Sequence, residues 1–311
     1  MNLARLKCVP LLYTTRDGVV DNIHRGSAVV VDCDGKVRKA FGDPGKLAFL
    51  RSSAKALQAI ALVERGGVEK FGFSDAELAL ICASHAGQDI HIATVGSILG
   101  KIGCVQSDLH AGSGIRDNCS GKHSGMLALC RLLGFPVTDY RSPTHPIQKV
   151  IRQTVADMCG LKPAQLKVAV DGCGAPIFGM PIRNMATAYA RLAMPEALPP
   201  ERRRACERIA RAMMAHPEMV GGLDLRAICP GKVVAKSGAS GVYCAGLIGA
   251  GLGFATKIDD GSGVPHHLVF FALMLRMKRI SQKEFNAYIR QSPLDVKNRC
   301  GDIVGRIEVA F

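Results

Sequence analysis

Alternating hydrophobic and polar positions predict strands near both ends of the chain. Residues 27–32 and 36–41 alternate in this way on either side of Asp34-Gly35, a dipeptide typical of hairpin turns. Near the other end, apolar runs separated by glycines predict further strands over 232–236, 241–247 and 251–258, and a closing strand over 303–309. Short connections favour antiparallel pairing. We therefore expect one mostly antiparallel sheet that contains strands from both ends of the chain.

Most of the remaining chain has the apolar spacing of amphipathic helices. Two helix starts carry capping boxes, Ser74 with Glu77 and Ser281 with Glu284. Helices are expected over 52–65, 74–85, 90–102, 120–133, 145–160, 180–192 and 200–214, with one strand at 166–170 and a final helical pair before the closing strand. These helices should cover the faces of the sheet. The predicted fold class is α/β of the α+β type, a single domain over 1–311 with a helical subdomain at about 70–165.

The composition fits one large globular domain. Hydrophobic residues make up 48% of the 311 residues, enough to bury a full core. The longest apolar stretch, 241–255, is too short and too rich in glycine to cross a bilayer, and residues 1–10 lack the apolar core of a signal peptide. Twelve cysteines are scattered among apolar residues, which is typical of buried thiols in a reducing compartment. We therefore expect a cytoplasmic protein.

The net charge of +14 raises the question of nucleic-acid binding. Basic residues are spread along the chain, and the one dense run, Arg202-Arg203-Arg204, lies between Glu201 and Glu207, which is typical of a solvated helix face. The chain has no Trp and few other aromatic residues to stack on bases. We expect the charge to aid solubility and to attract an anionic or zwitterionic small molecule, with neither nucleic acid nor membrane as a partner. A basic RNA-binding protein without catalysis is the alternative from a different class.

Two separated strings carry candidate chemistry. In Arg51-Ser52-Ser53-Ala54-Lys55, a helix that begins at Ser52 places Lys55 one turn later on the same face, where a neutral amine could take the serine proton. Far downstream, Lys236-Ser237-Gly238 could place an ammonium beside that pair and stabilise the charge of a tetrahedral intermediate. Together the strings indicate amide hydrolysis. The alternative is that Ser52 only caps a helix, Lys55 is solvated, and 236–238 is a strand ending in a turn.

A second cluster lies at residues 118–123, at the start of a predicted helix. Cys119 is one helical turn from Lys122 or His123, and Cys173 lies in a turn-like Asp-Gly-Cys-Gly string. Two thiolates, a nitrogen and a water would suit zinc, and Asp171 could orient that water. Two alternatives remain: the cysteines are unrelated core residues, or Cys119 is a nucleophile with His123 as its base.

Six ordered strings together resemble the asparaginase II family, also called class 3 L-asparaginases. They are RSSAK (51–55), CASHAG (82–87), NCSGKHSGML (118–127), DGCGAP (171–176), HPEMVGG (216–222) and KSGA (236–239). The resemblance runs nearly from end to end. Ala56 and Gln88 stand where we expect proline and glutamate, and the loop 110–118 is shorter than usual. We expect these departures to affect substrate affinity, strictness for asparagine over glutamine and oligomer contacts more than the chemistry.

The resemblance implies a fold similar to serine β-lactamases and glutaminases, and hydrolysis of L-asparagine to L-aspartate and ammonia. The family's two serine-lysine pairs match Ser52 with Lys55, and Ser84 with Lys236, while Lys257 is the less favoured partner of Ser84. We expect Ser52 to be the nucleophile and Lys55 its base. Ser84 and Lys236 would relay protons or stabilise charge.

The resemblance also implies a zinc site, substrate contacts and an oligomer. One zinc per chain, not strictly required for the chemistry, would be held by Cys119, Lys122 and Cys173. The candidates for binding substrate are Arg51, His85, Asn118 and Asp171. A homodimer is expected. The alternatives are a glutaminase or other serine amidase with the same chemistry, while a β-lactamase or peptidoglycan peptidase is disfavoured because those enzymes usually need export.

Overall fold

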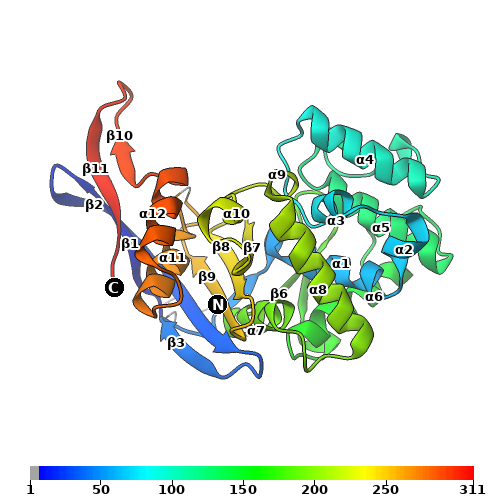
Figure 1. Cartoon of the computed structure of the whole chain (residues 1–311), viewed down its shortest axis with the longest axis horizontal. Helices are drawn as coiled ribbons and strands as arrows, with labels where there is room; N and C mark the ends of the chain where they lie inside the picture. Colours follow the sequence, from blue (N-terminus) through cyan, green and yellow to red (C-terminus); the bar gives the residue numbers. More distant parts are fainter. Residues whose placement is uncertain (1–6, 263) are drawn as a thin grey trace.

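The computed structural model describes residues 7–262 and 264–311, and its largest element is an antiparallel sheet. Eight strands form it, in the order β10-β11-β1-β2-β9-β8-β7 with β3 paired to β2 (Figure 1). The strands are β1 (Val9–Arg16), β2 (Val19–Asp32), β3 (Val37–Phe41), β7 (Val233–Gly238), β8 (Val242–Leu247), β9 (Leu252–Ile258), β10 (Asp295–Lys297) and β11 (Ile303–Val309). The C-terminal β11 lies directly beside β1. This confirms the predicted sheet built from both ends of the chain.

Several strands differ from those that the hydrophobic pattern predicts. The first strand was expected to start at residue 27, whereas β1 precedes it and β2 begins at Val19. The molecule also has a separate three-stranded sheet, β4-β6-β5, made of β4 (Leu47–Phe49), β6 (Pro176–Pro181) and β5 (Lys167–Val170). Of these, only β5 was expected. Five of the six residues of β6 are buried, so this strand has no polar alternation that could reveal it.

Helices cover both faces of the large sheet, as predicted. On one face, Val29 and Val31 of β2 join the core that contains α7 (Ile182–Ala193), while Ala28 and Val30 join the core of α11 (Leu268–Arg276) on the other face. The helix α12 (Gln282–Gln291) follows α11. Glycine permits the close approach of α7, because a Cβ atom at Gly253 would collide with the carbonyl oxygen of Ala186.

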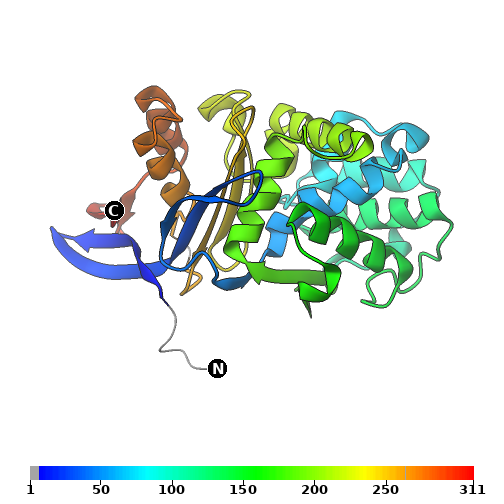
Figure 2. The same ribbon diagram turned by 90° about the horizontal axis from the view of Figure 1, so that it is seen from below.

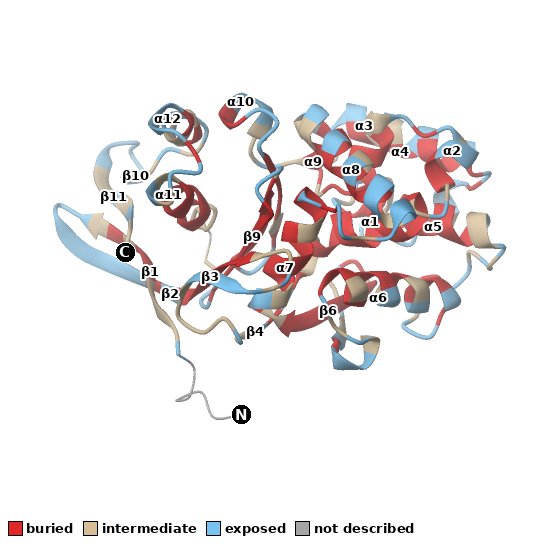
Figure 3. Ribbon diagram, turned by 60° about the horizontal axis from the view of Figure 1, so that its bottom comes forward, coloured by how far each residue is buried: buried red, intermediate tan, exposed pale blue. Residues whose placement is uncertain are grey.

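Most of the other helices gather at one end of the molecule, opposite β10 and β11 (Figures 1 and 2). They are α1 (Lys55–Val63), α2 (Gly67–Phe71), α3 (Asp75–Ile81), α4 (Asp89–Lys101), α5 (Ser120–Leu133), α6 (Pro146–Met158), α8 (Pro200–Ala215) and α9 (Pro217–Val220). The short α10 (Leu225–Ile228) lies between these helices and α12. Figure 3 shows α1 and α5 as mostly buried and the outer end of β2 as exposed. The helix α3 ends at Ile81, short of the expected residue 85, which leaves Ser84 and His85 in a loop.

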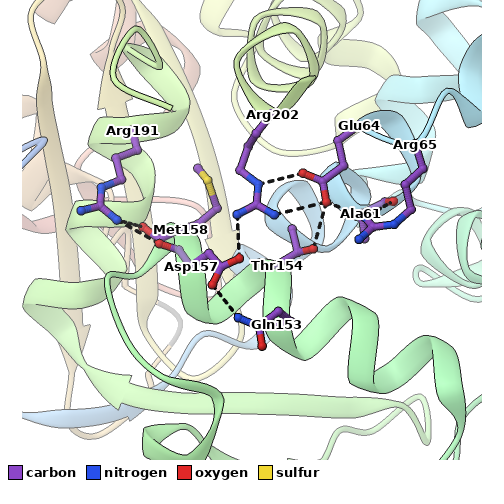
Figure 4. A network of polar contacts seen from close by, with 9 residues as sticks. All are labelled: Ala61, Glu64, Arg65, Gln153, Thr154, Asp157, Met158, Arg191 and Arg202. Atoms are coloured by element: carbon purple, nitrogen blue, oxygen red, sulfur yellow. Dashed lines mark hydrogen bonds and ion pairs between the residues drawn. The ribbon is translucent and has the colours of Figure 1, made fainter. Parts of the chain in front are cut away.

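Arg202 corrects the expectation of a fully solvated basic face on α8. Its guanidinium donates to Glu64 at 2.7 Å and to Asp157 at 2.8 Å, and its side chain is only 16% exposed (Figure 4). Arg203 and Arg204 do form exposed ion pairs, with Glu207 and Glu201. The run therefore joins α8 to α1 and α6 through one arginine and faces solvent with the other two.

Most of the cysteines are buried, as their apolar sequence contexts predict. All twelve cysteines are free thiols, and nine of them are buried. Across the part of the chain that the structure describes, no helix is both long and apolar enough to cross a membrane.

Candidate active site

A strained turn places Ser52 at the surface of the site. The chain enters a 3-10 turn, Arg51–Ala54, with Arg51 at φ +51°, a left-handed conformation that costs a non-glycine residue roughly 1–2 kcal/mol. The Arg51 side chain holds this turn through Asp171 and Ser240, with both hydrogen bonds at 3.0 Å. Ser52 is half-buried, and its hydroxyl makes no hydrogen bond to any described residue. It is therefore free to meet a substrate.

Ser53 joins the two predicted motifs. Its hydroxyl donates to the backbone oxygen of Lys236 at 2.7 Å, and the Tyr189 hydroxyl donates to the Ser53 carbonyl at 2.8 Å. At Gly238 a Cβ atom would lie 2.7 Å from the Leu50 carbonyl oxygen, so only glycine lets β7 pack this closely against the turn. The sequence contained Ser53 within a motif but gave no signal of this locking role.

Lys55 is bonded to the loop that carries Ser84 and to the backbone just before α5. Its Nζ donates to Ser84 Oγ at 3.0 Å and to the Asn118 carbonyl oxygen at 3.1 Å. The side chain is buried, and burial lowers the pKa of Lys55. A neutral amine has two hydrogens and one lone pair, so these two bonds use both hydrogens and leave the lone pair free to accept a proton.

Lys236 lies beside Lys55, whereas Lys257 lies elsewhere. Burial, followed by the charge of Lys55, lowers the pKa of Lys236 to about 7. Its Nζ donates to the Ser237 carbonyl at 3.1 Å. Lys257 instead donates to the carbonyl oxygens of Ser240 and Ile258, at 2.6 and 2.5 Å. The sequence left Lys236 and Lys257 open as partners of Ser84, but the described lysine bonded to Ser84 Oγ is Lys55. Of the two, Lys236 is the one close enough to Lys55 for the charge of Lys55 to lower its pKa.

The candidate substrate-binding residues are only partly available. The His85 ring is buried, with Nε2 at 2.8 Å from Ser120 Oγ and Nδ1 accepting the Gly87 N–H at 3.1 Å. Burial lowers the pKa of His85 to about 4, so this ring is neutral and already bonded at both nitrogens. Asp171 pairs with Arg51 at 3.0 Å. Asn118 is exposed, and its described contact with the site is through its carbonyl oxygen.

The structure brings the three expected zinc ligands together. Lys122 Nζ lies 2.9 Å from Cys173 Sγ. The neighbouring Cys119 thiol, together with His123 and Lys122, holds the pKa of Cys173 well below its usual range, while the pKa of Cys119 is raised by Cys173 and by burial. One nitrogen and two sulfurs therefore converge at a buried point, a donor set that suits zinc. Among described residues, no group of three or more His, Cys, Asp or Glu side chains is arranged to hold a metal. Metal binding by Cys119 and Cys173 would therefore need the Lys122 amine as the third ligand.

A small pocket opens beside the site. It has a volume of about 30 Å³ and lies between β7 and the helices α8 and α9. Lys236 and Ser237 line one side, and Met213, Val220 and Gly221 are among the residues that line the other. Val220 also accepts the Ser84 N–H at 3.0 Å, so the pocket wall and the Ser84 loop are joined.

Comparison with solved structures indicates a shared fold. Mglu, solved in its native form, is 15% identical to this chain with a TM-score of 0.50, and the match covers 82% of this chain and 65% of Mglu. This chain therefore spans slightly less than two thirds of Mglu. Other similar structures are a β-lactamase from Mycobacterium bovis (13% identity, TM-score 0.45, covering 81% of this chain and 94% of that one) and an octameric penicillin-binding protein homologue from Pyrococcus abyssi (14%, 0.44, 81% and 73%).

Comparison of sequences identifies the family. No curated protein sequence gives a significant match. The family model for L-asparaginase II, however, matches residues 12–309, which include all six strings and the whole of the site described above. The chain therefore belongs to the L-asparaginase II family.

Proposed function

We propose that this amidohydrolase converts L-asparagine to L-aspartate and ammonia through a serine acyl-enzyme. Membership of the family supports amide hydrolysis. The proposed serine mechanism rests mainly on one observation: the buried Lys55 amine lies 3.0 Å from Ser84 Oγ, and Lys55 follows Ser52 by one helical turn. Two serines beside two lysines of lowered pKa supply a nucleophile and its bases without further ionisable groups.

In the proposed reaction, Ser52 Oγ attacks the side-chain amide carbon and its proton passes to the Lys55 amine. Ser84, bonded to Lys55, then gives its proton to the amide nitrogen, which leaves as ammonia, and Ser84 recovers a proton from Lys55, whose amine is then neutral again. A β-aspartyl ester of Ser52 remains. Water attacks this ester and gives its proton to Lys55, and Lys55 passes that proton to the Ser52 oxygen as aspartate is released. Lys236, when protonated, would stabilise the negative oxygen of the tetrahedral intermediates.

An assay with three substrates tests this proposal. Purified protein would be incubated with asparagine, glutamine and a chromogenic β-lactam, while ammonia and ring opening are measured. We expect ammonia from asparagine. Ammonia from glutamine alone would indicate a glutaminase, and ring opening alone a β-lactamase; either result would contradict the proposed substrate. Retention on a polyanion column at low salt without any hydrolysis would favour the RNA-binding alternative.

We also propose that Cys119, Lys122 and Cys173 bind zinc. A bound zinc would supply a fixed positive charge close to the serine-lysine cluster. Lys122 must lose its proton to bind, so zinc affinity should fall as the pH falls. We expect about one zinc per chain in protein purified without chelator, and less in Cys119→Ser. Absence of bound zinc, together with no uptake from equimolar zinc at pH 8, would remove this part of the proposal.

We propose, finally, that two chains associate through the arm formed by the outer ends of β1, β2 and β11 with β10. The arm exposes Val19, Val20, Ile23 and Ile303. Strand β2 pairs with β9 only from Gly26 onward, so its outer half leaves one edge without a described partner strand. Such an edge favours pairing with another strand. Light scattering should give the mass of a dimer, and Val20→Lys should shift it toward the monomer; a monomeric wild type would exclude this surface as a dimer contact.

A further inference from the structure

Lys257 is a basic residue that the proposed reaction does not use. It lies near the end of β9 and is half-buried. Its Nζ donates to the carbonyl oxygens of Ser240 and Ile258, at 2.6 and 2.5 Å. The acidic residue closest in sequence, Asp259, pairs with Lys46. The hydrogen bonds described for the Lys257 amine are therefore with main-chain oxygen atoms.

Ser240 lies at the tip of the hairpin that joins β7 to β8. Its φ of +60° is in the left-handed region, which residues with a side chain rarely adopt. The next residue, Gly241, is also left-handed, with φ +71°, and its carbonyl oxygen accepts the Ile258 N–H at 2.9 Å. The end of β9 therefore holds this tip at two points, through the Lys257 amine and through the Ile258 backbone.

The same tip supports the turn that carries the proposed nucleophile. Ser240 Oγ accepts a hydrogen bond from Nη1 of Arg51 at 3.0 Å. Arg51 directly precedes Ser52 and is also left-handed, with φ +51°. Two strained backbone positions are thus joined by one side-chain hydrogen bond, and such positions persist only where their surroundings hold them. The other partner of Arg51, Asp171, follows β5, so the bond to Ser240 is the link from the guanidinium to the large sheet.

We infer that Lys257 is a positioning residue for Ser52. Its amine fixes the carbonyl group of Ser240 and so the direction of the Ser240 hydroxyl. That hydroxyl holds the Arg51 side chain, which in turn holds the backbone from which Ser52 projects. The inference rests on the proposed role of Ser52 as the nucleophile.

Substitutions at both ends of this chain of contacts should slow the reaction of Ser52. Lys257→Met removes the amine, and Ser240→Gly removes the hydroxyl while permitting the left-handed backbone. We expect each to lower the reactivity of Ser52 about 10–100-fold, because a small displacement of a reacting atom is costly. Lys257→Arg keeps N–H donors, and Ser240→Asn keeps a side-chain oxygen on a residue that tolerates positive φ. Both should recover part of the loss.

Lys101 supplies a matched control on α4. Its Nζ donates to the carbonyl oxygen of Gly72 at 2.8 Å and pairs with Glu77 at 2.7 Å. Lys101→Met therefore also removes a lysine that is bonded to a main-chain carbonyl group. Because these contacts are separate from the Ser52 turn, the reactivity of Ser52 should stay within about threefold of wild type.

The test measures how fast an alkyl fluorophosphonate labels Ser52 in each protein. The serine oxygen displaces fluoride from phosphorus, and mass spectrometry identifies the labelled peptide. This probe is not an amino acid, so its rate reports the position of Ser52 without asparagine binding. Unfolding curves establish that each variant is folded at the assay temperature. The double variant Lys257→Met/Ser240→Gly should react no more slowly than the slower single variant, because both changes break the same chain of contacts.

Three results would contradict the inference while the role of Ser52 stands. They are equal labelling of Ser52 in wild type and Lys257→Met, losses that multiply in the double variant, and an equal loss in Lys101→Met. If wild type is not labelled at Ser52, the inference and the proposed nucleophile both fail. Asparagine hydrolysis by the same sample then still tests the proposed substrate separately.

Discussion

Burial controls the chemistry of individual residues at this site. Two lysines at the site are buried: Lys55, whose amine is bonded to Ser84, and Lys236, whose carbonyl oxygen is bonded to Ser53. Removal from water lowers the pKa of each amine. A lysine in water is almost wholly protonated at neutral pH and cannot act as a base. The fold thus converts ordinary side chains into candidate proton acceptors, and two residue-scale predictions depend on this.

Ser52→Ala should reduce asparagine hydrolysis by several orders of magnitude and leave the fold intact. The Ser52 hydroxyl makes no described hydrogen bond, so its removal should change the free energy of unfolding by less than about 0.5 kcal/mol. Steady-state kinetics and thermal unfolding check the two parts. Retention of more than about one tenth of the wild-type turnover, equivalent to about 1.4 kcal/mol of barrier, would exclude Ser52 as nucleophile and leave Ser84 as the serine to examine.

The rate of hydrolysis should rise with pH through neutrality. The Lys55 amine must be neutral to accept the serine proton. The pKa of Lys55 is lowered and that of Lys236 is about 7, so both lysines lose their proton below the usual lysine range. The shift at Lys236 also affects stability. Between pH 7 and about 10 the unfolded chain binds more protons at Lys236 than the folded chain does, so this residue makes the folded state more stable as the pH rises. A rate that peaks in mild acid and declines toward pH 9 in folded protein would indicate a carboxylate or histidine base.

At the scale of elements, polar contacts fix the relative positions of the turn, the strands and the helices. The 3-10 turn Arg51–Ala54 is bonded to β7 through Ser53, and α8 is bonded to α1 and α6 through Arg202 (Figure 4). The first contact bears on catalysis and the second on stability. Each gives a prediction with a control elsewhere on the same element or motif.

Ser53→Ala should lower turnover more than it raises KM. Its loss leaves the buried carbonyl oxygen of Lys236 without its described side-chain donor, which costs about 1–3 kcal/mol, and lets the Ser52 turn shift against β7. Ser53→Thr keeps the hydroxyl and should retain more activity than Ser53→Ala. Kinetics of the three proteins, with unfolding curves, provide the check. Equal turnover in wild type and Ser53→Ala would show that the lock does not position the nucleophile.

Arg202→Met should lower the free energy of unfolding by about 2–3 kcal/mol, because it leaves Glu64 and Asp157 without their cation. The loss should be somewhat smaller than for a fully buried pair, since Asp157 is partly exposed. Arg203→Met, on the same helix, breaks only an exposed pair with Glu207 and should cost less than about 0.5 kcal/mol. Urea unfolding of both variants measures the difference. An equal loss of unfolding free energy in the two variants would mean that the burial of the Arg202 network does not add to stability.

Across the whole molecule, regular periodicity made most of the fold predictable. The helix α5 and the strand β11 begin and end where their patterns predict, and the capping boxes at Ser74 and Ser281 mark true helix starts. The sequence could not reveal β6, because this strand is buried on both faces and has no alternation of polar and apolar residues. It also could not reveal the first half of β2, because Val19, Val20 and Ile23 are exposed and do not follow an alternating pattern.

The sequence offered candidate residues for the site but not the contacts between them. Motif spacing placed Ser52 and Lys55 one turn apart, and the structure agrees. The bond from Lys55 to Ser84 joins residues 29 positions apart, and the bond from Ser53 to Lys236 joins residues 183 apart. Such contacts depend on how the helices pack against the sheet, which no local pattern encodes. His85 shows the limit: its residue type suggested substrate binding, but burial has already committed both ring nitrogens.

The central claim, a serine acyl-enzyme in asparagine hydrolysis, is tested most directly by trapping the intermediate. Protein mixed with excess asparagine would be quenched in acid within the first turnover, digested and analysed by mass spectrometry. We predict an aspartyl adduct on the peptide that contains Ser52, absent from Ser52→Ala. Active turnover of asparagine with no adduct on any peptide, or with the adduct on the peptide that contains Ser84, would contradict the account.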